Sequence, residues 1–177
     1  MAHLADMSFL EDSRDLLVPP LNFSVVAPGV YRSGYPNDKN FVFLKKLHLN
    51  TMLYLGPEPY AGPLKNFIEE ENIRVLYFDV KNNKEPFSDI DLSRVRDALV
   101  HVLDSRLYPL LVHCNKGKYR VGCLIGCLRK LQRWSLTSIF DEYSRFAGTN
   151  FRIADQESIE IFQEVVPYNT LHKPVWF

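Results

Sequence analysis

The sequence predicts a single-domain α/β fold in which helices flank a central, mainly parallel sheet. Short runs of β-branched and aromatic residues alternate with longer amphipathic stretches, the pattern of strands joined by crossover helices. The run PLLVH (109–113) is almost entirely apolar, as in a strand covered on both faces of a parallel sheet. The chain has 177 residues, 46% of them hydrophobic, which is enough for one domain with a substantial core.

The first half of the chain is expected to form a hairpin, two helices and two strands. The hairpin spans 23–34, because Pro28 and Gly29 provide a turn between two short apolar runs. Asn37 can cap the helix that follows. Beyond that helix we expect a buried strand over 51–55, an amphipathic helix over 64–72 and a strand over 74–80.

The second half begins with a polar loop, KNNKEPFSD (81–89), and a helix whose apolar residues recur three or four positions apart. The strand 109–113 comes next and leads into Cys114. Ligands of parallel sheets bind where loops leave the carboxyl ends of strands, so we expect the functional site here. Three further helices are expected around 121–134, 136–147 and 154–165.

The distribution of charge favours a compact anionic ligand. The formal net charge is zero, which argues against a protein built to bind nucleic acid. Residues 105–140 nevertheless contain no Asp or Glu. A locally basic surface on a neutral protein suits a small, densely charged ligand. The basic residues of this segment are Arg106, Lys116, Lys118, Arg120, Arg129, Lys130 and Arg133.

The cysteine content indicates a reducing compartment. Cys114, Cys123 and Cys127 form neither a disulfide framework nor a zinc-type spacing, so we expect free thiols and no metal or cofactor. Cys123 and Cys127, four residues apart on one helix, are expected to pack in the core.

The N-terminal segment also bears on location. MAHLADMSFLEDSRDLL carries acids and lacks the apolar core of a secretory signal, and no stretch of the chain reaches membrane-spanning length. We therefore expect a cytoplasmic or nuclear protein without membrane insertion. Residues 1–18 are expected to be a flexible leader, and residues 19–177 the folded domain.

The segment HCNKGKYRVG (113–122) has the composition of a loop that holds an anion against a sulfur. Gly117 permits a backbone conformation that other residues resist. The loop amides can then form an anion-binding nest, reinforced by a helix N-terminus near Val121. Arg120 returns close enough to grip two phosphate oxygens with its planar fork. The resulting positive field favours the thiolate form of Cys114.

Such a loop predicts covalent chemistry. A thiolate beneath a phosphoryl group is positioned for in-line attack, which gives a phosphocysteine that water then hydrolyses. The spacing Cys-x5-Arg is common by chance, but its context strengthens it: an apolar strand, a central glycine and a following helix. His113 is expected to fix Cys114 through a ring hydrogen bond behind the loop. The alternative is that Cys114 is a small buried hydrophobe beside a solvated basic turn.

Several segments together resemble the plant and fungal atypical dual-specificity phosphatases, a branch of the cysteine-based protein tyrosine phosphatase superfamily. They are HCNKGKYRVG with the helix after it, PPLNF (19–23), YRSGYP (31–36), LYLGPEPY (53–60), NKEPF (83–87) and RIADQ (152–156). The resemblance spans about 19–162. It implies a phosphatase fold with Cys114 as nucleophile and Arg120 as phosphate clamp. It also implies inositol pyrophosphates as a substrate class, with looser activity on phosphoproteins and phosphoinositides.

Three segments are expected to bind the substrate. Asn83 and Lys84 lie on a loop that should overhang the pocket. Arg152 either reaches the same rim or pairs with Asp155. The phosphate loop supplies Asn115, Lys116, Gly117, Lys118, Tyr119, Val121 and Gly122.

Two loop positions depart from the family's usual HCxxGKHRTG, since Tyr119 replaces His and Val121 replaces Thr. A hydroxyl at position 121 can donate a hydrogen bond to the sulfur and stabilise the thiolate as it leaves the phosphoenzyme. Valine lacks the donor, so slow breakdown of the phosphocysteine is expected. Tyr119 either reshapes the pocket rim or is a solvent-facing ring without consequence.

The general acid is not obvious from the sequence. Relatives use an Asp roughly thirty residues upstream of the cysteine to protonate the leaving oxygen. Asp89 and Asp91 are expected to begin the next helix, and Glu85 to pair with Lys84 or a nearby Arg. Asp79, at the end of a strand, is the first candidate. A pyrophosphate has a phosphate as its leaving group and needs less acid assistance, so it suits this chain better than a serine phosphate.

The sequence thus predicts a metal-independent phosphatase that acts through a phosphocysteine on inositol pyrophosphates. Hydrolysis of phosphotyrosine or phosphoinositides is the alternative among enzymes. A pseudophosphatase, which binds phosphate as a scaffold without useful turnover, is the alternative outside them. Val121 and the missing acid favour the scaffold, whereas Cys114 and Arg120 favour catalysis.

Overall fold

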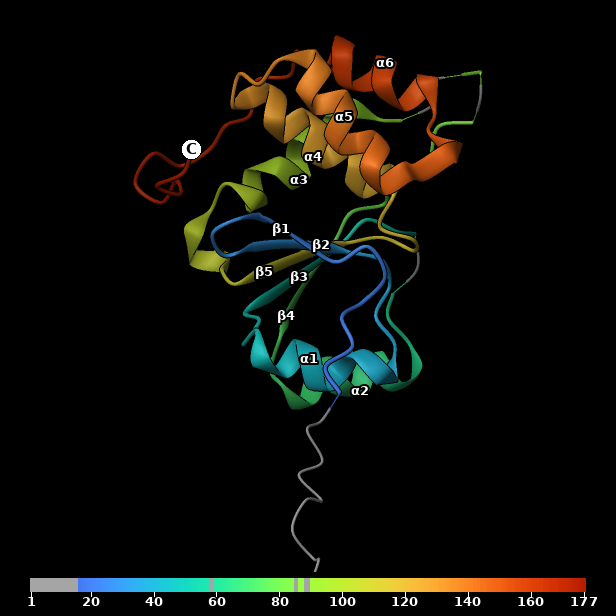
Figure 1. Ribbon diagram of the computed structural model, residues 1–177. Coiled ribbons are helices and arrows are strands. Elements are labelled where there is room, and N and C mark those ends of the chain that lie inside the picture. Colours follow the sequence, from blue (N-terminus) through green and yellow to red (C-terminus); the bar gives the residue numbers. More distant parts are fainter. Residues whose placement is uncertain (1–15, 58, 85, 88–89) are drawn as a thin grey trace, which may run out of the picture.

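A five-stranded sheet with the order β1-β2-β5-β3-β4 forms the centre of the computed structural model (Figure 1). Only β1 runs antiparallel to its neighbour, as the first arm of the expected hairpin. The mainly parallel α/β fold predicted from the sequence is confirmed. The strands are β1 (Ser24–Ala27), β2 (Val30–Ser33), β3 (Thr51–Tyr54), β4 (Arg74–Tyr77) and β5 (Leu110–His113).

The structure describes residues 16–57, 59–84, 86–87 and 90–177. The leader expected over 1–18 therefore lies, up to residue 15, outside the described residues. Within the described ranges, no helix combines the length and apolar character that crossing a membrane requires.

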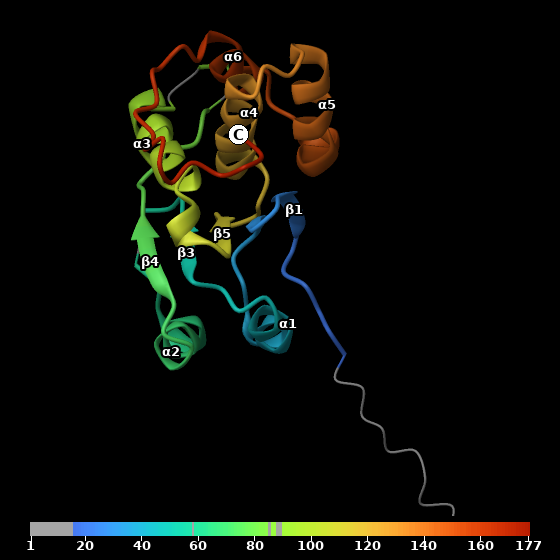
Figure 2. The ribbon, with the colours of Figure 1, turned by 90° about the vertical axis from the view of Figure 1, so that its left-hand side faces the viewer.

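Helices cover both faces of the sheet, with α1 and α2 on one face and α3 to α6 on the other (Figures 1 and 2). The parallel strands are thereby buried on both sides, as their apolar sequences require. The helices are α1 (Phe41–Lys46), α2 (Gly62–Glu70), α3 (Leu92–Val102), α4 (Tyr119–Leu131), α5 (Leu136–Ala147) and α6 (Ile153–Ile161).

Alternation along β5 divides its side chains between two cores. Leu110 and Val112 pack toward α3 to α6, and Leu111 packs toward α1 and α2, all without exposed surface. Burying a leucine of this kind contributes about 2 kcal/mol to folding. The same alternation sends the ring of His113 to the α1 and α2 side and the thiol of Cys114 to the other side. The strand thus fixes the direction of the reactive sulfur.

Element boundaries differ in small ways from the sequence-based expectations. β4 ends at Tyr77 instead of continuing to residue 80, because the amide of Val80 turns back to the carbonyl of Phe78. α4 begins at Tyr119, two residues earlier than expected, so Arg120 belongs to its first turn. This earlier start brings the helix N-terminus closer to Cys114.

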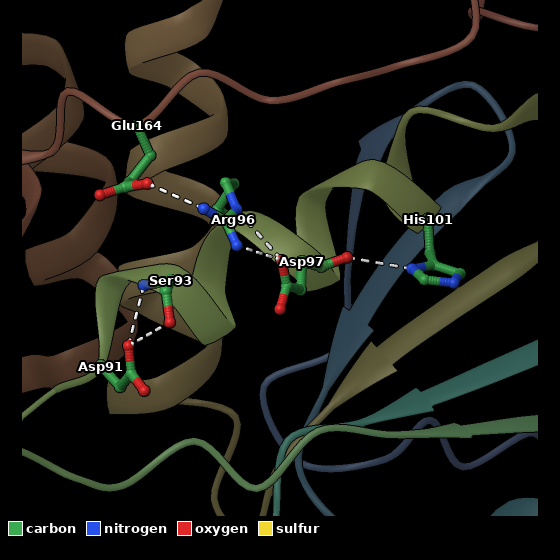
Figure 3. Close-up of polar contacts among 6 residues, drawn as sticks. All are labelled: Asp91, Ser93, Arg96, Asp97, His101 and Glu164. Carbon is green, nitrogen blue, oxygen red and sulfur yellow. Dashed lines mark hydrogen bonds and ion pairs between the residues drawn. The ribbon is translucent and has the colours of Figure 1, made fainter.

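α3 begins at a carboxylate cap, as expected for Asp91 (Figure 3). Oδ1 of Asp91 accepts hydrogen bonds from the amide of Ser93 at 2.9 Å and from its hydroxyl at 2.6 Å. These bonds lower the pKa of Asp91, and a cap of this kind stabilises a helix by about 1 kcal/mol. Farther along α3, Arg96 contacts Asp97 at 2.8 Å and Glu164 at 3.2 Å, which ties α3 to the chain beyond α6.

Candidate active site

Two adjoining cavities open at the carboxyl ends of the parallel strands, of about 810 and about 190 Å³. They share Asn82, Asn115 and Arg120. The larger is lined in addition by Tyr54, Pro57, Asp79, Val80, Lys81 and Lys84, and the smaller by Cys114, Lys116, Tyr119 and Arg152.

The reactive pair expected from the sequence lies together at the smaller cavity. Cys114 follows β5 and is 3% exposed, and Arg120 lies in the first turn of α4 and is 8% exposed. Both line the cavity, so each presents a small part of its surface to a ligand. A thiol and a guanidinium at one cavity floor can together bind and attack a phosphoryl group.

The backbone of the loop between them is turned by three anchors. The carbonyls of Asn115, Lys116 and Gly117 each accept a hydrogen bond from the segment 22–35. The donors are the amide of Tyr35 at 2.9 Å, Nδ2 of Asn22 at 2.7 Å and Nη2 of Arg32 at 2.9 Å.

Because N–H and C=O of a trans peptide point in opposite directions, the amides of residues 116–118 face away from these donors. Successive amides that face one way form an anion-binding nest, and the N-terminus of α4 adds its positive dipole end. That these amides converge on a bound anion, as expected from the sequence, stays a prediction.

Gly117 makes the turn possible. Its φ is +67°, a left-handed conformation that side chains resist. A Cβ atom there would lie 2.5 Å from the amide nitrogen of Gly34, so β2 and the loop pack backbone to backbone. Glycine is required at this position both for conformation and for space.

Arg152 and Tyr119 form one wall of the smaller cavity. The guanidinium carbon of Arg152 lies 3.7 Å from the centre of the Tyr119 ring, and Nη1 donates to the carbonyl of Asn83 at 2.8 Å. Of the two placements expected for Arg152, the structure shows the one at the rim. Oδ2 of Asp155 instead accepts a hydrogen bond from the hydroxyl of Tyr143 at 2.5 Å.

Asn83 is placed differently from the expectation that it binds substrate. Its side chain is 1% exposed and points toward α6, where Nδ2 donates to Oδ1 of Asp155 at 2.9 Å. Its Oδ1 accepts from the amide of Ile90 at 2.7 Å. The neighbouring Asn82 lines both cavities, together with Lys84 in the larger one. Asn83 therefore anchors the loop, and Asn82 takes the place at the cavity.

Other loop residues support the site from outside the cavities. Nζ of Lys118 donates to the carbonyl of Ala147 at 3.3 Å, which directs this amine to the end of α5. Val121 has no exposed surface and packs in the core, and Gly122 lets Tyr143 approach α4, where a Cβ atom would lie 2.8 Å from that ring. Of the expected loop ligands, Asn115, Lys116 and Tyr119 line the cavities.

His113 is buried behind the loop, as expected. Nε2 hydrogen bonds with the hydroxyl of Tyr60, and the ring stacks on Tyr54 with 4.8 Å between centres. Burial lowers the pKa of His113 to about 3, so the ring is neutral at physiological pH. A neutral imidazole that Tyr60 and Tyr54 hold fixes the end of β5, which Cys114 follows, and does not act as a base.

Asp79 is exposed and lines the larger cavity, which it shares with Arg120. It is the one carboxylate at either cavity among the described residues. Asp91 is committed to capping α3, and Glu85 and Asp89 lie outside the described residues. Asp79 therefore stays the first candidate for a general acid.

The two remaining cysteines pack in α4. Cys123 and Cys127 are 1% and 0% exposed, and burial raises the pKa of both thiols. Each is a free thiol in the core, as expected.

Comparison with known proteins places these features in a family. A family model described as "Tyrosine phosphatase family" matches residues 17–176. "Inositol diphosphatase DSP1" of Oryza sativa subsp. japonica is 51% identical over 147 residues, which cover 83% of this chain and 66% of the relative, just under two thirds of its length. "Inositol diphosphatase DSP4" of Arabidopsis thaliana is 45% identical over 163 residues, which cover 92% of this chain and 81% of the relative.

Solved structures of related proteins have the same fold. The core catalytic domain of the PP-IP phosphatase SIW14 from S. cerevisiae, crystallised with citrate, has a TM-score of 0.78 and 45% identity, covering 82% of this chain and 88% of that one. TpbA of P. aeruginosa shares the fold with a TM-score of 0.61 at 21% identity. The resemblance recognised from the motifs is confirmed, and the chain belongs to the tyrosine phosphatase family.

Proposed function

We propose that the protein is a cysteine-dependent phosphatase that removes the terminal phosphate of a diphosphate group on an inositol pyrophosphate. The observation that carries this proposal is the loop between Cys114 and Arg120. Hydrogen bonds from Asn22, Arg32 and Tyr35 hold three of its backbone carbonyls. The names of the relatives in rice and Arabidopsis support the diphosphate as the bond cleaved.

The reaction takes place in two displacements. The Cys114 thiolate attacks the terminal phosphorus in line, an S–P bond forms, and the P–O bond to the inner phosphate breaks. Water then attacks the phosphocysteine, the S–P bond breaks, and inorganic phosphate leaves as the thiolate returns. Arg120 and the loop amides bind the three equatorial oxygens and stabilise the charge in both transition states.

The leaving group explains why the first displacement does not need a well-positioned general acid. The inner phosphate of a diphosphate is a much weaker base than an alkoxide, so it leaves with little protonation. Asp79, exposed on the larger cavity, is the residue that could protonate a more basic leaving group. The site therefore favours anhydride cleavage over hydrolysis of alkyl phosphate esters.

The size and charge of the larger cavity suit a ring that carries several phosphates. Its volume of about 810 Å³ exceeds what a single phosphate needs. Lys81 and Lys84 line it, and Asp79 is the one carboxylate among its described lining residues. Arg152 and Lys116 add positive charge at the smaller cavity. The basic rim can bind the ring phosphates while the loop binds the one that is removed.

Val121 favours a second candidate, a phosphate-binding scaffold with little turnover. Its side chain is fully buried and provides no donor to the sulfur. The Cys114–Arg120 pair at an open cavity favours catalysis. A reactive thiolate also requires reducing conditions, so we propose a cytoplasmic or nuclear location.

The deciding experiment measures phosphate release from three substrates by the wild-type protein and by Cys114→Ser. The substrates are a diphosphoinositol polyphosphate, a phosphotyrosine peptide and a phosphoinositide. Cys114-dependent release that is fastest on the diphosphate supports the proposal. Faster release from either of the other two replaces it with that activity, and binding without release on all three favours the scaffold.

A further inference from the structure

Arg32 is a buried charge beneath the phosphate loop. It lies on β2, opposite Val112 of β5, and is 1% exposed on the face of the sheet that α4 and α5 cover. Nη2 donates to the carbonyl of Gly117 at 2.9 Å. The guanidinium carbon lies 3.6 Å from the centre of the Phe146 ring on α5. The side chain therefore joins the loop, the sheet and α5.

No carboxylate pairs with Arg32 in the part of the chain that the structure describes, and its Nε there has no hydrogen-bond acceptor. Arg129, the comparable buried arginine of α4, contacts Glu142 at 2.8 and 3.0 Å. A buried cation without an ion pair is costly, because it has lost its hydration. Burial accordingly lowers the pKa of Arg32 to about 10.

Two anions act on Arg32 across this interior. Glu142 favours the charged form of Arg32, and Arg129 opposes it. An ionised Cys114 also favours it, because Val112, the partner of Arg32 in the sheet, lies two residues before Cys114 and on the same side of the sheet. The charge of Glu142 is already balanced by Arg129, which it contacts directly. The anion left to compensate Arg32 is the thiolate, or the phosphate bound above it.

We propose that Arg32 is a positioning residue, which holds the phosphate loop through Gly117 and whose buried positive charge favours the anionic state of the active site. The proposal goes beyond the phosphatase function above and rests on it only for the identity of the bound anion. By reciprocity, the thiolate also makes the burial of Arg32 less costly.

The other groups that face Cys114 leave this contribution measurable. The cations that share the smaller cavity with Cys114, namely Lys116, Arg120 and Arg152, are common to the wild-type protein and the variants. His113 is neutral because burial lowers its pKa, and Cys123 is neutral because burial raises its pKa. A change in the charge at Arg32 should therefore appear directly in the ionisation of the reactive thiol.

The test measures the rate of iodoacetamide alkylation against pH on the full chain, with Cys114→Ser as the blank for Cys123 and Cys127. It needs no substrate, so its outcome is independent of whether a diphosphate is cleaved. Arg32→Met is expected to raise the midpoint of the alkylation profile by about one pH unit. Arg32→Lys keeps a positive charge in part, because burial also lowers the pKa of a lysine, and is expected to give a midpoint between those of the wild type and Arg32→Met.

The same variants test the loop contact through binding of orthovanadate. Arg32→Lys cannot reproduce the planar fork and is expected to weaken vanadate binding about tenfold. The control is Arg129→Met with Glu142→Gln, which removes a buried cation together with its carboxylate and should change neither readout. A folded Arg32→Met protein with the wild-type midpoint overturns the electrostatic role. If Arg32→Met does not fold, wild-type vanadate affinity in Arg32→Lys overturns the positioning role.

Discussion

The guanidinium of Arg152, at the start of α6, stacks on the ring of Tyr119, at the start of α4, with 3.7 Å between the carbon and the ring centre. Nη1 of the same guanidinium holds the carbonyl of Asn83 at 2.8 Å. Two helices and the loop after β4 thus meet at one wall of the smaller cavity. Tyr119 is a part of the pocket rim and not a free surface ring.

Removing the aromatic ring of Tyr119 should weaken substrate binding with little effect on the chemical step. Tyr119→Leu deletes a cation–π contact worth about 1 kcal/mol, so KM for a diphosphoinositol polyphosphate should rise about fivefold while kcat changes little. Tyr119→Phe keeps the ring face and is the matched control, expected to retain most of the affinity. Equal KM values for the leucine and phenylalanine variants would show that the stacking has no role in binding.

Gly117 and Gly148 form a natural pair for testing the loop. Both have positive φ, +67° and +68°, but a Cβ atom at Gly117 would meet Gly34 at 2.5 Å, whereas at Gly148 nothing lies within 4 Å. Gly148→Ala should cost about 1 kcal/mol of stability and keep vanadate binding. Gly117→Ala should cost more and abolish vanadate binding. Calorimetric titration with thermal unfolding checks both, and vanadate binding by a folded Gly117→Ala protein would contradict the backbone account.

A hydroxyl at position 121 should speed the second displacement. Val121→Thr keeps the shape of a fully buried side chain and adds a donor toward the sulfur. A hydrogen bond to a charged group is worth about 1.5 kcal/mol or more, so breakdown of the phosphocysteine should accelerate roughly tenfold. Single-turnover and steady-state rates measure it, with Val121→Ala as the variant that gains no donor. Unchanged rates in the threonine variant would remove Val121 as the cause of slow turnover.

The buried network around Asp155 should set the position of the substrate loop. Asp155→Asn leaves one oxygen for two donors, Nδ2 of Asn83 at 2.9 Å and the hydroxyl of Tyr143 at 2.5 Å. We expect a loss of about 2 kcal/mol in unfolding free energy and faster hydrogen exchange of residues 81–84. Ser158→Ala, which removes a different acceptor of the same amide, should have a smaller effect. Exchange rates at wild-type level in Asp155→Asn would uncouple the loop from α6.

His113 should make the fold sensitive to acid. Its pKa is about 3 in the folded protein and about 6.5 unfolded, so between these values the unfolded chain binds the additional proton. The stability from this group is complete above pH 6.5 and falls by about 1.4 kcal/mol per pH unit as pH drops toward 3. Urea unfolding of the wild-type protein and His113→Asn should show the steeper decline in the wild type. Parallel declines would mean that His113 does not titrate in this window.

Much of the fold could be predicted, because each element has a local cause in the sequence. The turn at Pro28 and Gly29, the apolar run of β5 and the cap at Asp91 all depend on neighbouring residues. The last residue of β4 and the first residue of α4 were less predictable, since they depend on where the chain leaves the sheet.

The reactive centre was predicted for the same reason, because Cys114, Gly117 and Arg120 lie within one loop. The anchors of that loop were not predicted, although Asn22, Arg32 and Tyr35 lie in segments that resemble the family. Their roles arise from contacts with residues 80 to 94 positions away, which one sequence does not reveal. The prediction that Asn83 lines the cavity was off by one residue, since Asn82 lies there, and the reason is related. The burial of its side chain depends on α6, whose distance from this loop along the chain conceals the contact.

The central claim is that Cys114 carries the phosphoryl group during turnover. The most direct measurement mixes the protein with a diphosphoinositol polyphosphate, quenches the reaction with acid and analyses the peptides by mass spectrometry. The account predicts one phosphoryl group on Cys114, absent when Cys114→Ser is treated in the same way. Release of phosphate by the wild-type protein without a phosphorylated Cys114, or equal release by the serine variant, would contradict it.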